Sequence, residues 1–174
     1  MFYMHVHGHG SRVELARKVK RALDLIGKGT NRPAAAPTST PAAASAPTMD
    51  TAKIAQIAGY QGEQNGAVYK ITVGRDDLKL TEIGAPINAR MGLNTWAAFA
   101  GDDEDAVVAG DVAMVAAEVT PVLKALREAG LQIVAIHHHM TTGQPTVYFL
   151  HYWGRGRAET LAGGVRAALD KLPK

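Results

Sequence analysis

The stretch IVAIHHHMTTGQPTVYFLHYWGRG, from Ile133 to Gly156, decides the fold. Two apolar runs of strand length flank the polar segment TTGQ, and this pattern predicts an antiparallel β-hairpin. Three consecutive histidines, His137 to His139, end the first run, and His151 lies inside the second. Each of these histidines is therefore a candidate metal ligand, a candidate acid/base group or a half-buried strand residue.

The segments around this hairpin predict an α+β domain. A short helix precedes an alternating strand, a second hairpin turns at DDED, and an amphipathic helix follows each hairpin. These segments are residues 51–58 (helix), 66–75 (strand), 95–101 with 106–114 (hairpin), 118–130 (helix) and 158–172 (helix). The order β-β-α-β-β-α, with an additional strand in front, predicts an antiparallel sheet that helices cover on one face.

Composition divides the chain into three parts. Residues 1–27 predict a strand followed by an amphipathic helix that ends at Gly27. Residues 28–49 contain repeated prolines and small residues, which cannot bury enough apolar surface to offset the entropy of ordering, so we expect a disordered Pro/Ala linker. Residues 50–174 hold all the elements of a complete domain.

The N-terminal part repeats the end of the chain. The segment FYMHVHGHGSRVELARKVKRALDLI aligns without a gap on YFLHYWGRGRAETLAGGVRAALDKL, which places His5 on His151 and Gly10 on Gly156. We therefore interpret residues 1–27 as the C-terminal strand and helix of a truncated first repeat, and residues 50–174 as the second repeat. A lone strand and helix expose unpaired backbone and apolar side chains, so we expect this arm to dock, with a homodimer as one route.

Five segments carry a resemblance to a known family: FYMHVHGHG, INARMGLNTWAAFAG, VVAGDVAM, EVTPVLKALREAGLQIVAIHHHM and FLHYWGRG. Together they resemble the bacterial LppY/LpqO lipoprotein homologues, a two-repeat family with a domain of unknown function. The resemblance implies an exported, envelope-associated protein but no established chemistry. The N-terminus lacks the features of a signal peptide, so the chain as written is expected in the cytoplasm.

Composition limits the functions that remain. The chain has no cysteine, which excludes disulfides, thiol catalysis and cysteine zinc sites, so a metal would have to use histidine, carboxylate or methionine. The formal net charge is only +3, and the basic residues are scattered, so nucleic-acid binding is not expected. No apolar stretch approaches the length of a membrane span.

The histidine spacing predicts a metal site. On a strand, His137 and His139 share one face and His138 points the other way. An odd-numbered hairpin loop would bring His151 onto the same face as His137, whereas an even-numbered loop would place it with His138. His5 and His7 share a face of their own strand. We therefore name as candidate ligands for zinc or copper His137, His139, His151, His5 and His7.

A second group of residues predicts a pocket beside the histidines. The loop INARMGLNTW is too long for a simple connection, and Arg90, Asn94 and Trp96 in it are candidate pocket-lining residues, together with Met140. Asp111 and Glu118 lie near the start of a predicted helix, where capping is the first interpretation and support of a metal ligand the second.

The sequence leaves three functions open, and the catalytic residues, if any, are unknown. A binding module for a divalent metal or small ligand needs only the histidines. A metal-dependent hydrolase needs in addition an open coordination position and a carboxylate base. A structural or interaction domain without metal would use the histidines and aromatic residues as a contact surface.

Overall fold

A computed structural model describes residues 6–26, 48–140 and 143–173 of the chain. The chain divides into two units, residues 1–43 and 44–174. Most of the predicted linker, residues 28–49, lies outside the described residues. His5 also lies outside them. In the part of the chain that the structure describes, no helix is long and apolar enough to cross a membrane.

The first unit contains helix α1, Arg12–Leu23. The side chain of Ser11 caps its start by accepting a hydrogen bond from the backbone of Glu14 at 3.3 Å. The helix ends at Leu23, earlier than the predicted stop at Gly27. Residues 6–10 belonged to the predicted strand, but the structure shows no strand there.

The local structure of α1 agrees with the ungapped alignment of the two chain ends. Its bounds coincide, residue for residue, with those of helix α4, Ala158–Leu169. The aligned glycines Gly10 and Gly156 have φ values of 151° and 155°, a region that glycine enters freely because it has no Cβ. The repeat itself stays a prediction.

The second unit is built on a six-stranded sheet in which every neighbouring pair is antiparallel, as the sequence predicted. The strand order is β1-β2-β5-β6-β8-β7. The strands are β1 (Gly62–Asn65), β2 (Val68–Gly74), β5 (Asn94–Gly101), β6 (Ala106–Met114), β7 (Gln132–His137) and β8 (Tyr148–Gly156). The α+β fold class is therefore confirmed.

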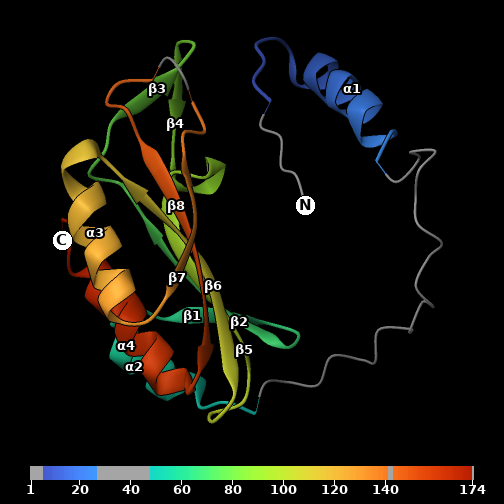
Figure 1. The fold of residues 1–174 in the computed structure, drawn as a ribbon. Helices are drawn as coiled ribbons and strands as arrows, with labels where there is room; N and C mark the ends of the chain where they lie inside the picture. Colours follow the sequence, from blue (N-terminus) through green and yellow to red (C-terminus); the bar gives the residue numbers. More distant parts are fainter. Residues whose placement is uncertain (1–5, 27–47, 141–142, 174) are drawn as a thin grey trace. The chain divides into compact units, whose positions relative to one another are not determined.

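Three helices cover one face of this sheet (Figure 1). They are α2 (Thr51–Ala58), α3 (Ala116–Glu128) and α4. Apolar side chains of α3 and α4, such as Val122, Leu126 and Val165, are almost fully buried against inward-facing strand residues such as Phe99 and Leu150. Burial of this apolar surface is the main force that holds helices and sheet together.

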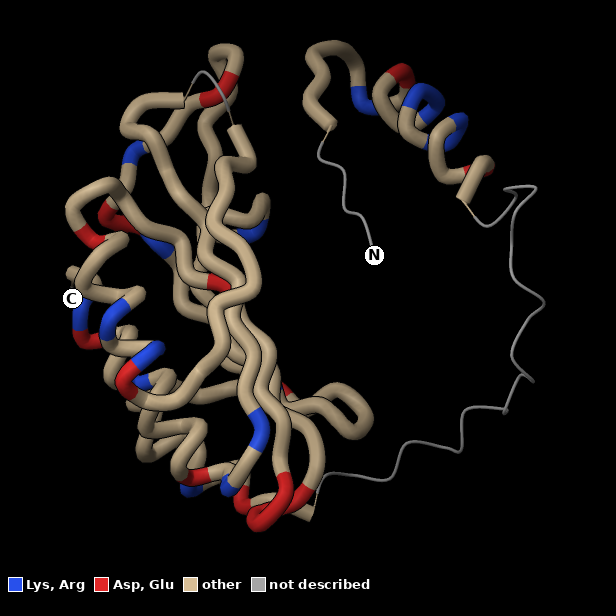
Figure 2. The backbone as a smooth tube through the Cα atoms, viewed as in Figure 1, with Lys and Arg blue, Asp and Glu red and all other residues tan. Residues whose placement is uncertain are grey.

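A small hairpin that the sequence did not predict covers one end of the opposite face. It consists of β3 (Leu80–Glu82) and β4 (Ala85–Ile87), and a short 3-10 helix, η1 (Ala89–Met91), follows it. Leu80 packs there with Phe149 and Ala113 of the main sheet in a second apolar cluster. Acidic residues gather at the β5–β6 turn, at the other end of the sheet (Figure 2).

Register places four side chains in one row on the sheet face opposite the helices. Trp96 of β5 pairs with Asp111 of β6, which pairs with His151 of β8, and His151 pairs with Ala135 of β7. Residues that pair directly across antiparallel strands have their side chains on the same face. The row therefore brings an acidic and a histidine side chain together in the middle of the sheet.

Candidate metal centre

The register between β7 and β8 decides which histidines meet. His137 pairs with Phe149, and Ala135 pairs with His151, so His137 and His151 lie on the same face two positions apart. This is the arrangement that the odd-numbered alternative predicted. Strand β7 ends at His137, however, and the connection to β8 is longer than the predicted TTGQ loop. His139 is therefore placed by its side-chain contacts and not by strand alternation.

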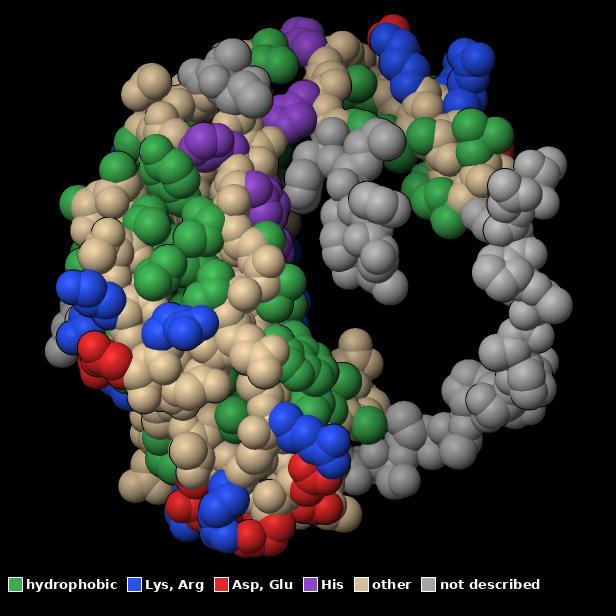
Figure 3. Space-filling model, in the orientation of Figure 1, with side chains coloured by type: hydrophobic (Ala, Val, Ile, Leu, Met, Phe, Trp, Pro, Cys, Tyr) green, Lys and Arg blue, Asp and Glu red, His purple; other side chains and the backbone are tan. Residues whose placement is uncertain are grey.

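The three rings form a compact cluster. Nε2 of His137 and Nε2 of His151 are 2.8 Å apart, and their ring centroids are 4.9 Å apart. The ring of His139 stacks on His137 at 4.9 Å and on Phe149 at 3.8 Å. One ring nitrogen from each histidine lies within 4.8 Å of the others. All three residues are partly exposed. Histidine side chains are visible on the face of the molecule drawn in Figure 3.

His138 belongs to a different environment. Its ring is tilted against Tyr148 at a centroid distance of 4.6 Å. Tyr148 neighbours Phe149 on β8, and successive strand residues point to opposite faces. His138 therefore leaves the cluster and offers a matched control for substitutions within it.

Two of the clustered rings have their other nitrogen beside an oxygen atom. Nδ1 of His137 is 3.3 Å from the carbonyl oxygen of His138. Nδ1 of His151 is 3.8 Å from Oδ1 of Asp111. A proton on each Nδ1 faces an acceptor, and the tautomer with that proton leaves the lone pair of Nε2 directed at the other histidine. Two such lone pairs at 2.8 Å repel each other unless a proton or a metal cation lies between them.

The distances fit a metal ion with little rearrangement. Two imidazole nitrogens at about 2.0–2.1 Å from a tetrahedral ion are separated by about 3.3 Å. The Nε2 atoms of His137 and His151 would have to move apart by about half an ångström, and His139 would have to move closer. Rotations about the side-chain bonds provide shifts of this size.

The capping interpretation is wrong for Asp111. This residue lies inside β6, within the predicted hairpin, and is only 4% exposed. The apolar run around it, AVVAGDVAM, contained the available signal: a carboxylate inside a buried strand is costly, and such a residue has a partner.

Tyr152 of β8 lies on the helix-covered face of the sheet, opposite the face of His151. Its ring lies directly against Gly110, where a Cβ atom would come within 2.1 Å of it, and its hydroxyl donates to the carbonyl oxygen of Trp96 at 3.4 Å. Burial, together with the negative charge of Asp111, raises the pKa of Tyr152. The hydroxyl therefore stays protonated and acts as a hydrogen-bond donor.

The structure distributes the other candidate pocket residues over several places. Arg90 is exposed in η1, and Asn94 donates to the carbonyl oxygen of Ala89 at 2.5 Å, which holds that turn. Trp96 lies in the row of Asp111 and His151, with Nζ of Lys70 4.6 Å above its ring. Met140 packs against the second apolar cluster. His7 is described within the first unit.

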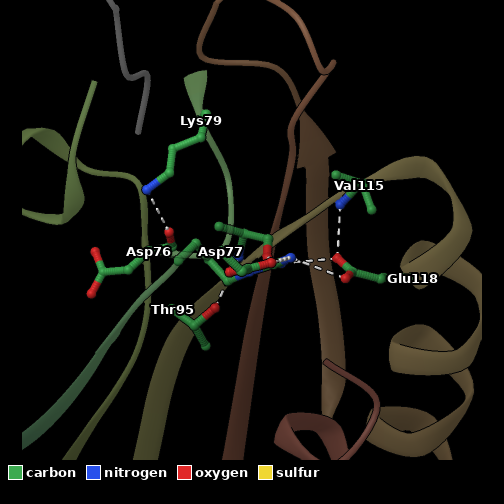
Figure 4. Close-up of polar contacts among 8 residues, drawn as sticks. Asp76, Asp77, Lys79, Thr95, Val115 and Glu118 are labelled. Carbon is green, nitrogen blue, oxygen red and sulfur yellow. Dashed lines mark hydrogen bonds and ion pairs between the residues drawn. The ribbon is translucent and has the colours of Figure 1, made fainter. Parts of the chain in front are cut away.

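Glu118 has a structural role, in agreement with the first interpretation of it. Its carboxylate accepts a hydrogen bond from the backbone of Val115 at 2.8 Å, which caps α3, and it binds Arg75 through both oxygens at 2.8 and 3.0 Å (Figure 4). Arg75 also donates to the carbonyl oxygen of Ala113 and to Asp77. This network joins the end of β2 to the end of β6 and to α3, and α3 begins two residues earlier than predicted.

Fold and cluster together define an α+β domain with three histidines that lie close enough together to hold a metal ion. The chain matches the family described as Domain of Unknown Function (DUF1259) over residues 52–171, and it belongs to that family. The match spans all the elements from α2 to α4. No curated protein and no solved structure matches the chain. The resemblance to lipoprotein homologues stays a prediction.

Proposed function

We propose that this domain binds a divalent first-row metal ion, zinc or copper, through His137, His139 and His151. The observation that carries the proposal is the distance of at most 4.8 Å among one ring nitrogen from each of the three histidines. Neutral imidazole is a good ligand for both metals. The Nδ1 contacts of His137 and His151 support it further, because the second ring N–H of a histidine ligand usually donates a hydrogen bond to an oxygen.

Metal analysis of the full chain, purified with a tag that contains no histidine, tests this proposal. After incubation with zinc or copper and dialysis, we expect elemental mass spectrometry to find about one metal ion per chain. His137→Ala, His139→Ala and His151→Ala should each lower the metal content strongly. His138→Ala is the matched control and should retain the metal, because its ring contacts Tyr148.

The N-terminal histidines require a separate variant, since His5 and His7 were also predicted ligands. His5→Ala combined with His7→Ala should leave the bound metal in place. Loss of metal in that variant, with full binding in the His137 and His151 variants, would move the site to the N-terminal segment. An equal metal content in all variants would show adventitious binding.

Metal-dependent hydrolysis is the second candidate function. Among the described residues the cluster offers three ligands, and a tetrahedral ion with three protein ligands keeps one position for water or substrate. Turnover of simple ester and phosphoester substrates by the metal-loaded protein, lost in His151→Ala, would support this candidate. Stoichiometric metal without turnover would support metal binding and contradict hydrolysis.

Association of the chain is a further part of the proposal. Val19 and Leu23 of α1, and Ile26 just after it, are 41–75% exposed, so apolar side chains of this segment are not buried. A homodimer through this N-terminal arm would bury it. Light scattering should therefore give the mass of a dimer for the wild type and the mass of a monomer for Val19→Asp combined with Leu23→Asp. A wild type with the mass of a monomer would contradict the dimer. Envelope association is proposed only on the basis of the family resemblance.

A further inference from the structure

We infer that Asp111 is a positioning residue that fixes the tautomer and orientation of His151 for the metal ion, an inference that rests on the proposed function. Asp111 and His151 are directly paired on neighbouring strands β6 and β8. The carboxylate Oδ1 lies 3.8 Å from Nδ1 of His151, and Nε2 of the same ring lies 2.8 Å from His137. The carboxylate is thus on the side of the imidazole that faces away from the cluster.

Burial makes the carboxylate effective. Asp111 is 4% exposed, and it is flanked along β6 by side chains that are apolar or absent, such as Val112 and Gly110. A charge in such surroundings is screened poorly, so its attraction for an N–H at this distance is stronger than at the protein surface. The Nδ1–H tautomer of His151 is favoured as a result, and the Nε2 lone pair is kept for the ion.

Metal binding and the carboxylate act in the same direction. A separation of 3.8 Å is longer than a hydrogen bond, which is about 2.7–3.2 Å for N–H···O. An ion between His137 and His151 has to push the two Nε2 atoms apart from 2.8 Å. Any part of that shift made by His151 moves its ring toward Asp111, where Nδ1–H and the carboxylate form a closer contact. Outer carboxylates of this kind typically change metal affinity by about 10–100-fold.

Asp111→Asn tests the inference through two readouts. We expect zinc affinity, measured by competition with a chromophoric chelator, to fall by about 10–100-fold while circular dichroism shows a folded protein. Asp105→Asn is the matched control: it removes the carboxylate bound to Arg155, which is also a β8 residue, and should leave zinc affinity unchanged. An Asp111→Asn variant with wild-type zinc affinity would overturn the positioning role.

The second readout needs no metal, and its wild-type measurement does not depend on the folding of a variant. Nitrogen-15 NMR of histidine-labelled, zinc-free wild-type protein at neutral pH should show His151 protonated on Nδ1, and Asp111→Asn should shift that population toward Nε2–H. A wild-type His151 that carries its proton on Nε2 alone overturns the inference. If the wild type binds no zinc, the proposed function fails, and the tautomer still decides whether Asp111 orients the ring.

Discussion

The Nε2 atoms of His137 and His151 lie 2.8 Å apart across the β7–β8 pair, and each ring has its Nδ1 beside an oxygen atom. The oxygen atoms favour a proton on each Nδ1, which leaves the lone pairs of the two Nε2 atoms pointing at one another. Such lone pairs repel unless a cation lies between them. A proton satisfies this requirement in part, since only one ring can then donate. A metal ion would satisfy both nitrogens together, and His139 is close enough to be a third ligand.

Binding of a metal should stabilise the fold. At free zinc about 100-fold above the dissociation constant, linkage gives about 2.7 kcal/mol, which corresponds to a rise in melting temperature on the order of 10 °C for a domain of this size. Thermal scans with and without zinc measure the rise. His151→Ala should remove it and His138→Ala should keep it; an equal rise in both variants would point to binding elsewhere.

Arg75 should contribute much of the stability at the junction of β2, β6 and α3. Its side chain is 3% exposed and binds both oxygens of Glu118, so Arg75→Met leaves a buried carboxylate and should cost about 3–5 kcal/mol in urea unfolding. Arg75→Met combined with Glu118→Leu should cost less than the sum of the single changes. Strict additivity of the two would show that the pair is not coupled.

The contribution of Asp77 should depend on pH. Its hydrogen bond to Arg75 lowers the pKa of Asp77, so the stabilisation is complete above its ordinary pKa and is lost as pH falls through the lower pKa of the folded state. Because the side chain of Asp77 is 36% exposed, Asp77→Asn should cost at most about 1 kcal/mol at neutral pH. Urea unfolding at stepwise lower pH measures the difference in free energy of unfolding between wild type and Asp77→Asn. This difference should vanish in acid, and a difference that grows there would contradict a lowered pKa of Asp77.

Adjacent glycines in α4 should respond oppositely to alanine. A Cβ on Gly163 meets no atom within 4 Å, so Gly163→Ala should stabilise the helix by about 0.5–1 kcal/mol. A Cβ on Gly164 would lie 2.9 Å from Cβ of Ala129 and 3.1 Å from Leu131, so Gly164→Ala should destabilise by about 1–3 kcal/mol. Urea midpoints measure both, and a tolerated Gly164→Ala would mean that the α3–α4 contact is loose.

The sequence predicted the main sheet and its helices because each has a clear hydrophobic period. Residues 106–114 and 51–58, for example, form β6 and α2 within the bounds expected from their patterns. Strand β1 was missed because Gly62–Asn65 is polar and largely exposed, so it lacks the alternation that marks a half-buried strand. The β3–β4 hairpin was missed because strands of three residues are too short to show a hydrophobic period.

The candidate site could be predicted only in part. Spacing indicated that His137 and His139 belong together, but the side of His151 depended on the hairpin register, which the sequence left open between two alternatives. The structure resolves it with the His137–Phe149 pair. The neighbour of His151, Asp111, lies 40 positions earlier in the chain, and only the β6–β8 pairing brings the two together.

A crystal structure of the zinc-soaked protein, with anomalous diffraction recorded on both sides of the zinc absorption edge, tests the central claim most directly. The account predicts one strong anomalous peak within about 2.0–2.1 Å of a ring nitrogen of each of His137, His139 and His151, with Asp111 hydrogen-bonded to Nδ1 of His151. A map without a peak at these three histidines, or with zinc bound only at other residues, would contradict it.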